Sequence, residues 1–406
     1  MKKILFYSTD VRQPTGYARI SYKLLNHLAE DENNDIYHFA ISDFKELRVE
    51  RQLNPRIKVI NALEEDKKIN SEELYGVDII KKFIDIIKPD VVFIYNDLVV
   101  VCRLFNELAE HKKNNNYKIY VYIDLVYEYE KYKYIEFMDR NSDLIYTFSD
   151  IWKDNLIKMN VNPNKIKILY HGINTDQIFK IDKLEARKRL GLDNNDFIIL
   201  NTNRNSYRKN WETTISAFLI FLKRNNYNPR IKLYINCVLN LTHSYDLFDI
   251  IKISCLKYDM DYFKTVSTHI IHYANKQTGT LSDETLNLIY NACDIGINTC
   301  VGEGVGLCNL EHAYLGAPQI VSNVGGLKDI FKNGYSILIE PKTNYYIGSS
   351  IDDHGGYISI TDPNDFANAI NEYYKKPKKL INDSCNIQKD IKTRFMWDDI
   401  LKNFNI

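Results

Sequence analysis

Short apolar runs alternate along this chain with longer segments of helical periodicity, and this alternation limits the possible folds more than any other feature. In the first half the runs are KILFYS, RIKVI, DVVFIY, KIYVYI, DLIYTF and KIKILY, and in the second DFIILN, IKLYIN, HIIHY, DIGIN, APQIVS and YSILI. Strand-like runs separated by helical segments are typical of repeated βα units and parallel sheets. The pattern therefore predicts an α/β chain with open, doubly wound sheets, which bind ligands at the carboxyl ends of their strands.

The chain has 406 residues, which exceeds the size at which one hydrophobic core usually keeps growing. Turn residues and one charged helical segment separate the two sets of strand candidates. We therefore expect a Rossmann-like N-terminal domain over residues 1–178 and a Rossmann-like C-terminal domain over residues 179–384, facing each other across a cleft. Residues 385–406 are expected to form a C-terminal helix that packs back toward the first domain.

Charge, hydropathy and cysteine usage exclude several classes of protein. Lys plus Arg and Asp plus Glu number 53 each, so the overall charge does not indicate nucleic acid or an anionic membrane as a partner. The start, MKKILFYSTDVRQ, has too short an apolar run for a signal peptide, and no later run approaches the roughly 18 apolar residues of a spanning helix. The cysteines form no C-x-x-C pair, which favours free thiols. We expect a cytoplasmic protein with at most peripheral membrane association.

The segment GEGVGLCNLE, from Gly302 to Glu311, follows the apolar run DIGIN. Its three glycines let the backbone approach a ligand closely, and a helix that begins near Leu307 would offer free N–H groups and the positive end of its dipole. Such an arrangement suits a phosphate. The alternative is that the glycines only shape a tight turn.

Two carboxylates lie eight positions apart in this segment. Glu303 precedes the expected helix, whereas Glu311 falls about one turn inside it, so the two cannot do the same work. Because a carboxylate accepts hydrogen bonds from hydroxyl groups, the pair could hold two different sugar rings, with a diphosphate between them on the glycine backbone. A capping or surface role for Glu311 is the alternative.

Basic residues follow the first strand of the second half, in ILNTNRNSYRKNW. Arg204 is a fork-shaped donor and Lys209 a point charge, and both suit a diphosphate whose charge grows as it leaves. Arg208 is a neighbour that could substitute for either, and a solvated basic loop is the alternative. In the first half, Gly16 lies between a strand and a helix, where it would let the backbone approach a phosphate.

With these motifs the chain resembles retaining glycosyltransferases of the GT-B fold, specifically family 4, also called glycosyl transferases group 1. The resemblance rests on the Arg204 and Lys209 pair, on the Glu303 and Glu311 pair, and on LSDETLNLIYNACDIGIN, LGAPQIVSNVGG and NGYSILIEP. It spans most of residues 165–400. The first half matches only loosely, as expected of an acceptor-binding domain, and the second would bind the nucleotide-sugar donor.

The resemblance also implies roles for single residues. Glu311 would bind the ribose hydroxyls, and Glu303 the hydroxyls near C3 and C4 of the donor sugar. Arg204 and Lys209 would hold the diphosphate. The backbone contacts to the donor are expected at Gly16, Gly304, Val305, Gly306 and Leu307, with the nucleotide base near Tyr273. Members of this family generally need no divalent metal, and the leaving phosphate is thought to take the acceptor proton on the front face.

Two features depart from the family pattern. Asp124 stands where the family often places a histidine facing the donor sugar. It could orient the sugar or accept a proton, and it could equally cap the following turn. The segment from Lys342 to Ser359 is longer than usual and is interpreted as a surface hairpin, with an acceptor contact as the alternative.

Taken together, the residues and the resemblance predict a retaining hexosyltransferase. It would move a hexose from a UDP-sugar or GDP-sugar to a hydroxyl of a glycan or other acceptor, without a metal. Three alternatives stay open: a GT-B sugar-nucleotide epimerase, a phosphorylase, and a non-catalytic nucleotide-sugar-binding module. A phosphorylase would need a lysine for pyridoxal phosphate in a longer chain, and a binding module would be expected to have lost part of the charged set.

Overall fold

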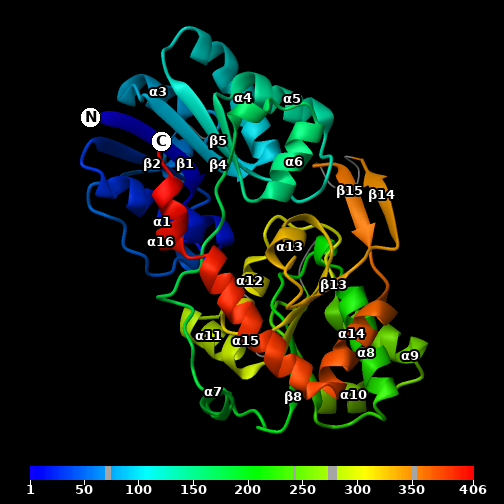
Figure 1. Cartoon of the computed structure of the whole chain (residues 1–406). Helices are drawn as coiled ribbons and strands as arrows, with labels where there is room; N and C mark the ends of the chain where they lie inside the picture. The colour runs from blue at the N-terminus through cyan, green and yellow to red at the C-terminus, as the bar shows by residue number, and fades with distance from the viewer. Residues whose placement is uncertain (69–74, 241–243, 273–280, 349–353) are drawn as a thin grey trace. The chain divides into compact units, whose positions relative to one another are not determined.

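The computed structural model describes residues 1–68, 75–240, 244–272, 281–348 and 354–406 (Figure 1). The chain divides into two compact units, each with its own sheet. Unit 1 comprises Met1–His171, Ile347–Gly356 and Asp398–Ile406, and unit 2 comprises Gly172–Tyr346 and Tyr357–Trp397. The domain boundaries expected at residues 178 and 384, and the packing expected of the C-terminal helix, remain predictions.

Within the described residues, unit 1 contains a seven-stranded parallel sheet in the order β3-β2-β1-β4-β5-β6-β7. The strands are β1 (Lys2–Thr9), β2 (Asn34–Ile41), β3 (Lys58–Asn61), β4 (Val91–Asp97), β5 (Lys118–Asp124), β6 (Leu144–Thr147) and β7 (Ile166–Ile168). Its helices are α1 (Gly16–Glu30), α2 (Ala62–Lys68), α3 (Ile80–Ile87), α4 (Leu98–Lys113), α5 (Tyr132–Asn141) and α6 (Asp150–Lys158), with short 3-10 turns η1 (Lys45–Leu47) and η2 (Pro163–Lys165). Apolar runs such as β4 are buried almost throughout, as strands covered on both faces are.

Strand β2 is the element of unit 1 that the apolar runs do not predict. Its sequence NDIYHFAI is interrupted by His38, which is fully buried and lies 3.1 Å from the Ser8 hydroxyl through its Nε2. Burial lowers the pKa of His38 to about 4, so the ring is neutral and is tolerated in the sheet. Because this polar residue breaks the apolar run, the sequence does not predict β2, although all of its residues pair with β1.

Unit 2 contains, among its described residues, a six-stranded parallel sheet in the order β10-β9-β8-β11-β12-β13. The strands are β8 (Phe197–Asn201), β9 (Ile231–Ile235), β10 (Ile270–His272), β11 (Ile295–Asn298), β12 (Gln319–Ser322) and β13 (Ile337–Ile339). Each of them falls on a predicted run. The segment interpreted as a surface hairpin forms the two-stranded sheet of β14 (Thr343–Ile347) and β15 (Gly356–Ile360).

The helices of unit 2 are α7 (Lys183–Leu190), α8 (Trp211–Arg224), α9 (Leu247–Lys257), α10 (Tyr262–His269), α11 (Asp283–Ala292), α12 (Leu307–Tyr314), α13 (Gly325–Ile330), α14 (Pro363–Lys375) and α15 (Pro377–Arg394), together with the 3-10 turn η3 (Tyr207–Lys209). The chain ends in α16 (Trp397–Ile400) and the 3-10 turn η4 (Leu401–Asn403). In the part of the chain that the structure describes, no helix combines the length and the apolar character needed to cross a membrane.

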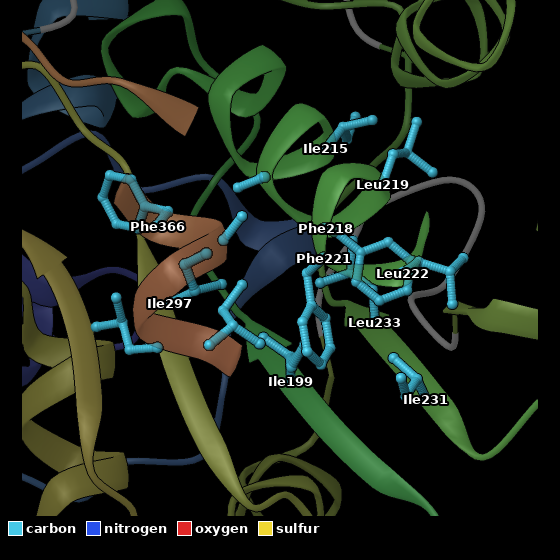
Figure 2. Packing of buried hydrophobic residues seen from close by; sticks show 14 of the residues in the cluster. Ile199, Ile215, Phe218, Leu219, Phe221, Leu222, Ile231, Leu233, Ile297 and Phe366 are labelled. Carbon is cyan, nitrogen blue, oxygen red and sulfur yellow. The ribbon is translucent and has the colours of Figure 1, made fainter. Parts of the chain in front are cut away.

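The core of unit 2 lies where α8 packs against β8 and β9. Phe218, Phe221 and Leu222 of α8 meet Ile199 and Leu233 of the two strands (Figure 2). Helix α14 adds Phe366 from the other side of this cluster. Burying each such side chain contributes about 1.5–3 kcal/mol. This packing holds the carboxyl ends of β8 and β11 in place, and the two sheets confirm the predicted α/β fold with two Rossmann-like domains.

Candidate functional site

Two loops that leave the carboxyl ends of β8 and β11 are joined to each other by hydrogen bonds. The Thr299 hydroxyl lies 2.9 Å from the carbonyl oxygen of Asn210 and 2.7 Å from the Thr214 hydroxyl. The Val301 N–H donates to the carbonyl oxygen of Arg208 over 3.0 Å. Strands β8 and β11 are neighbours in the sheet, which brings the two predicted motifs together. The loop after β8, with its basic residues Arg204, Arg208 and Lys209, and the glycine-rich loop after β11 therefore form one site within unit 2.

Glu303 lies at the centre of this site, between two cations. Lys209 Nζ contacts its Oε2, and Arg208 Nη1 donates to its Oε1 over 3.2 Å. Glu303 is 6% exposed and Lys209 8%. Burial opposes the charge of the carboxylate, but the nearby charges of Lys209 and Arg208 outweigh it and lower the pKa of Glu303 to about 2. Glu303 is thus a buried, ionised hydrogen-bond acceptor.

Glu311 lies about one turn inside α12, as predicted, and it is 6% exposed, which excludes the interpretation as a surface residue. The Tyr290 hydroxyl of α11 donates to its Oε2 over 3.0 Å. The Tyr290 ring stacks on His312, with ring centroids 5.5 Å apart and planes inclined by 20°. Burial lowers the pKa of His312 to about 3, so that ring is neutral. Tyr290 was not predicted as a site residue, although it lies in the family-like segment LNLIYNACDIGIN.

The glycine-rich loop needs glycine at defined positions. Gly306 has a φ of +81° and immediately precedes α12, which begins at Leu307 as predicted. No side chain caps this helix, so its positive end faces the loop. The Gly326 N–H of α13 donates to the carbonyl oxygen of Glu303 over 3.1 Å, and a Cβ at Gly326 would lie 2.0 Å from the carbonyl oxygen of Gly304. The two glycine segments therefore pack backbone against backbone.

Gly306→Ala is expected to lower the free energy of unfolding by about 2–4 kcal/mol. The left-handed conformation costs an L-residue roughly 1–2 kcal/mol, and the new Cβ would meet Leu327 Cδ2 at 2.6 Å. Gly334→Ala is the matched control, since Gly334 has a φ of +79° but no atom within 4 Å of the added Cβ. Urea unfolding of both variants separates strain from packing. Equal losses in the two variants would show that the Leu327 contact is unimportant.

The remaining predicted residues are distributed over both units. Arg204 lies in the same loop as Lys209, ahead of the turn η3, and its side chain is exposed. Val305 and Gly304 belong to the glycine-rich loop. In unit 1, Gly16 is the exposed first residue of α1, and Asp124 ends β5 beside Asp97 of β4. The part of Gly16 and Asp124 in a donor site remains a prediction.

Asp124 has a partner, the partly exposed Tyr17, that sequence reasoning missed. Burial, the negative charge of Asp124 and the hydrogen bond between the two side chains hold the pKa of Tyr17 well above its usual value. The Tyr17 ring also packs on Tyr95, with ring centroids 4.9 Å apart. Tyr273, the predicted contact of the base, lies outside the described residues.

Across the described ranges, no group of three or more His, Cys, Asp or Glu side chains is arranged to hold a metal ion. The predicted independence from metal stays a prediction. What the site offers is a buried ionised carboxylate, two cations that contact it, a helix N-terminus and a second carboxylate bonded to a tyrosine. This set can bind a polyhydroxylated ligand that carries negative charge.

Comparison with solved structures shows similarity over nearly the whole chain. An Anabaena protein, HepE, in complex with UDP and glucose is similar at a TM-score of 0.69 and 14% identity, with 99% of this chain and 98% of that chain covered. Sucrose-phosphate synthase from Thermosynechococcus elongatus is similar at a TM-score of 0.71 and 15% identity, with 98% and 96% covered. A glycosyltransferase from Rickettsia africae is similar at a TM-score of 0.66 and 14% identity, with 99% of both chains covered. These likenesses confirm the predicted fold class.

Among curated proteins, an uncharacterized glycosyltransferase of Methanocaldococcus jannaschii is 26% identical over 253 residues. The match covers 60% of this chain, which spans about half, 53%, of that relative's length. The model of the family "Glycosyl transferases group 1" matches residues 182–386, about half of the chain, including both loops of the site. The chain therefore belongs to the glycosyl transferases group 1 family.

Proposed function

We propose that this protein is a retaining glycosyltransferase that moves a hexose from a UDP-sugar or GDP-sugar to a hydroxyl of a glycan or other acceptor, without a metal. The observation that carries the proposal is the buried, ionised Glu303 between Lys209 and Arg208. A carboxylate in this state accepts hydrogen bonds from sugar hydroxyls, and the cations beside it suit a diphosphate. Family membership supports the transferase class.

The proposed mechanism assigns a task to each part of the site. Glu303 accepts hydrogen bonds from hydroxyls near C3 and C4 of the donor sugar. Lys209, Arg204 and the N-terminus of α12 stabilise the negative charge that develops on the diphosphate as its bond to the sugar breaks. The acceptor oxygen bonds to the same face of the sugar while its proton passes to the departing phosphate oxygen. This path needs no nucleophile from the protein, and Asp124 is proposed to orient the sugar.

Glu311 is proposed to bind the ribose hydroxyls of the donor. We expect Glu311→Ala to weaken the binding of nucleotide and nucleotide sugar about tenfold or more, because hydrogen bonds to a charged group contribute roughly 1.5–3 kcal/mol. Tyr290→Phe keeps the carboxylate but removes the hydrogen bond that Tyr290 donates to it, so we expect a weakening of about fivefold. Isothermal titration with UDP and GDP measures both effects.

Tyr373→Phe is the matched control for Tyr290→Phe. Tyr373 is buried in unit 2 and donates to Asp383 Oδ2 over 3.1 Å, so its loss removes the same kind of hydrogen bond elsewhere. We expect it to lower stability but to leave nucleotide affinity unchanged. Equal nucleotide affinity in the Tyr290→Phe variant and the wild type would remove Tyr290 from the site.

UDP-glucose is the first donor to test, because the Anabaena protein of similar fold has been solved with UDP and glucose. NMR of the product of transfer shows whether the anomeric configuration of the donor is kept, as we expect.

We expect EDTA to leave the rate of transfer unchanged. A complete loss of transfer that Mg²⁺ reverses would contradict a metal-free mechanism. Donor turnover without an acceptor would favour the epimerase, and tight binding without turnover the binding module. The cytoplasmic location rests on the free thiols and stays part of the proposal.

A further inference from the structure

Arg208 contacts three consecutive residues of the loop that follows β11. Its carbonyl oxygen accepts from the Val301 N–H over 3.0 Å. Its Nη1 donates to the carbonyl oxygen of Gly302 over 2.8 Å and to Glu303 Oε1 over 3.2 Å. The side chain of Arg208 is 21% exposed and that of Glu303 is 7% exposed, so the contact is largely shielded from water. From the sequence, Arg208 was only a possible substitute for Arg204 or Lys209.

The two cations differ in what they can do for Glu303. Lys209 contacts Oε2 with an ammonium group, which is a point charge without a preferred plane. Arg208 contacts Oε1 with a planar guanidinium that is also bonded to the backbone of the preceding residue. One cation on each oxygen, with one of them anchored to the loop, fixes the plane of the carboxylate. Since each carboxylate oxygen has two lone-pair sites, each keeps one for a hydroxyl of the ligand.

We propose that Arg208 is a positioning residue for the donor sugar, which fixes the carboxylate plane of Glu303 and thereby sets how strongly the site prefers a nucleotide sugar to the bare nucleotide. This inference rests on the proposed function. It differs from the role proposed for Lys209 and Arg204, which is to bind the diphosphate directly. It also predicts that the effect of Arg208 on binding passes through Glu303.

A double-mutant cycle tests this coupling. Isothermal titration gives the dissociation constants for UDP and UDP-glucose and for GDP and GDP-mannose. We define the sugar factor as the dissociation constant of the nucleotide divided by that of its nucleotide sugar. We expect Arg208→Gln and Glu303→Gln each to lower the sugar factor about tenfold, as for the loss of one charge-assisted hydrogen bond. The double variant should fall no further than either single variant, because the two residues act as one unit.

Two outcomes would overturn the inference. If Arg208 binds the donor itself, the two effects multiply and the double variant loses about a hundredfold. If Arg208→Gln keeps the sugar factor of the wild type, Arg208 has no part in sugar binding. A wild type that binds none of the four ligands refutes the proposed function, and this inference with it. A wild type that binds nucleotides with a sugar factor of one refutes only the inference.

Two further variants separate positioning from charge and from folding. Arg208→Lys keeps the positive charge, so we expect an affinity for bare UDP or GDP close to that of the wild type together with a lowered sugar factor. A wild-type sugar factor in Arg208→Lys would mean that charge alone suffices, which contradicts positioning. Arg230→Gln is the matched control, since Arg230 is an exposed arginine of unit 2 paired with Asp193 and Asp196. We expect it to bind every ligand as the wild type does.

Discussion

Lys209→Ala is expected to lower kcat about a hundredfold to a thousandfold while it changes KM for the donor much less. Removal of one preorganised group that stabilises developing charge typically costs this much. Lys209 is 8% exposed and contacts Glu303 directly. Bulk water therefore cannot compensate for the loss of its charge. In the proposed mechanism the ground-state diphosphate retains Arg204 and the α12 N-terminus, whereas the departing phosphate loses the point charge of Lys209.

The same variant should change the pH dependence of the reaction. In the wild type the pKa of Glu303 is lowered to about 2, so the carboxylate is ionised across the working range. Without Lys209 the cost of burial is opposed by Arg208 alone, and the pKa of Glu303 rises. Because Glu303 must be ionised to accept hydrogen bonds, activity will be lost at a higher pH as the solution is acidified. A kcat/KM profile from pH 4 to 8 measures this shift.

Lys223→Ala is the control for Lys209→Ala. Lys223 lies near the end of α8 and donates to the carbonyl oxygen of Tyr258, at an exposed position away from the two loops. We expect wild-type kinetics from it. A Lys209→Ala enzyme with kcat within about threefold of the wild type, and an unshifted acid limb, would remove Lys209 from the mechanism.

Glu303→Ala is expected to abolish measurable transfer and to lower the free energy of unfolding by about 3 kcal/mol. The substitution leaves Lys209 and Arg208 largely buried without their shared anion, and breaking a buried ion pair in this way costs roughly 3–5 kcal/mol. The lower figure applies because the side chain of Arg208 is 21% exposed. Urea unfolding measures the loss, and Glu303→Gln keeps the shape of the side chain as a control for packing.

A ligand should reverse part of that loss. Because the two cations in Glu303→Ala have lost the carboxylate that they share, a nucleoside diphosphate would supply the missing negative charge. We expect UDP or GDP to raise the unfolding free energy of the variant more than that of the wild type, while the sugar conjugate gives no further gain. A variant as stable as the wild type, with the same response to nucleotide, would show that the three charges are not coupled.

Much of the fold follows from the sequence because buried parallel strands leave continuous apolar runs. All six strands described for the unit 2 sheet fall on such runs, and α12 begins at Leu307 as predicted. Strand β2 was missed because His38 breaks its run, and only the structure shows that burial keeps this ring neutral. An apolar run therefore predicts a buried strand well, but it fails where a polar side chain within the strand is buried against a partner on another strand.

The site was predictable in its residue types but not in its partners. Two arginines lie in one loop, and the sequence does not say which of them reaches Glu303. The 3-10 turn η3 and the left-handed Asn210, with a φ of +49°, turn Arg208 and Lys209 toward the glycine-rich loop. The bond from Tyr290 to Glu311 joins residues 21 positions apart on different helices. Such pairs depend on how helices pack against each other, which the hydrophobic periodicity of a single helix does not predict.

The hairpin shows the same limit on a larger scale. Its length predicts a surface hairpin, and the structure describes two paired strands there, β14 and β15, but the segment Ile347–Gly356 groups with unit 1. There the carbonyl oxygen of His354 accepts from the Lys131 N–H over 3.0 Å. The buried Glu130 accepts from the Val126 N–H over 2.9 Å beside it. A contact between residues so far apart in the chain leaves no local signal in either segment.

A thermal-shift titration of the purified protein tests the central claim, that unit 2 contains a working nucleotide-sugar site. The ligands are UDP, GDP, ADP and CMP with their common sugar conjugates, and Glu311→Ala is measured alongside the wild type. A ligand at about a hundred times its dissociation constant adds roughly 2.7 kcal/mol to the stability of the state that it binds. We predict that one nucleotide family stabilises the wild type and has little effect on Glu311→Ala. Absence of stabilisation by every ligand, or equal stabilisation of the two proteins, would contradict the account.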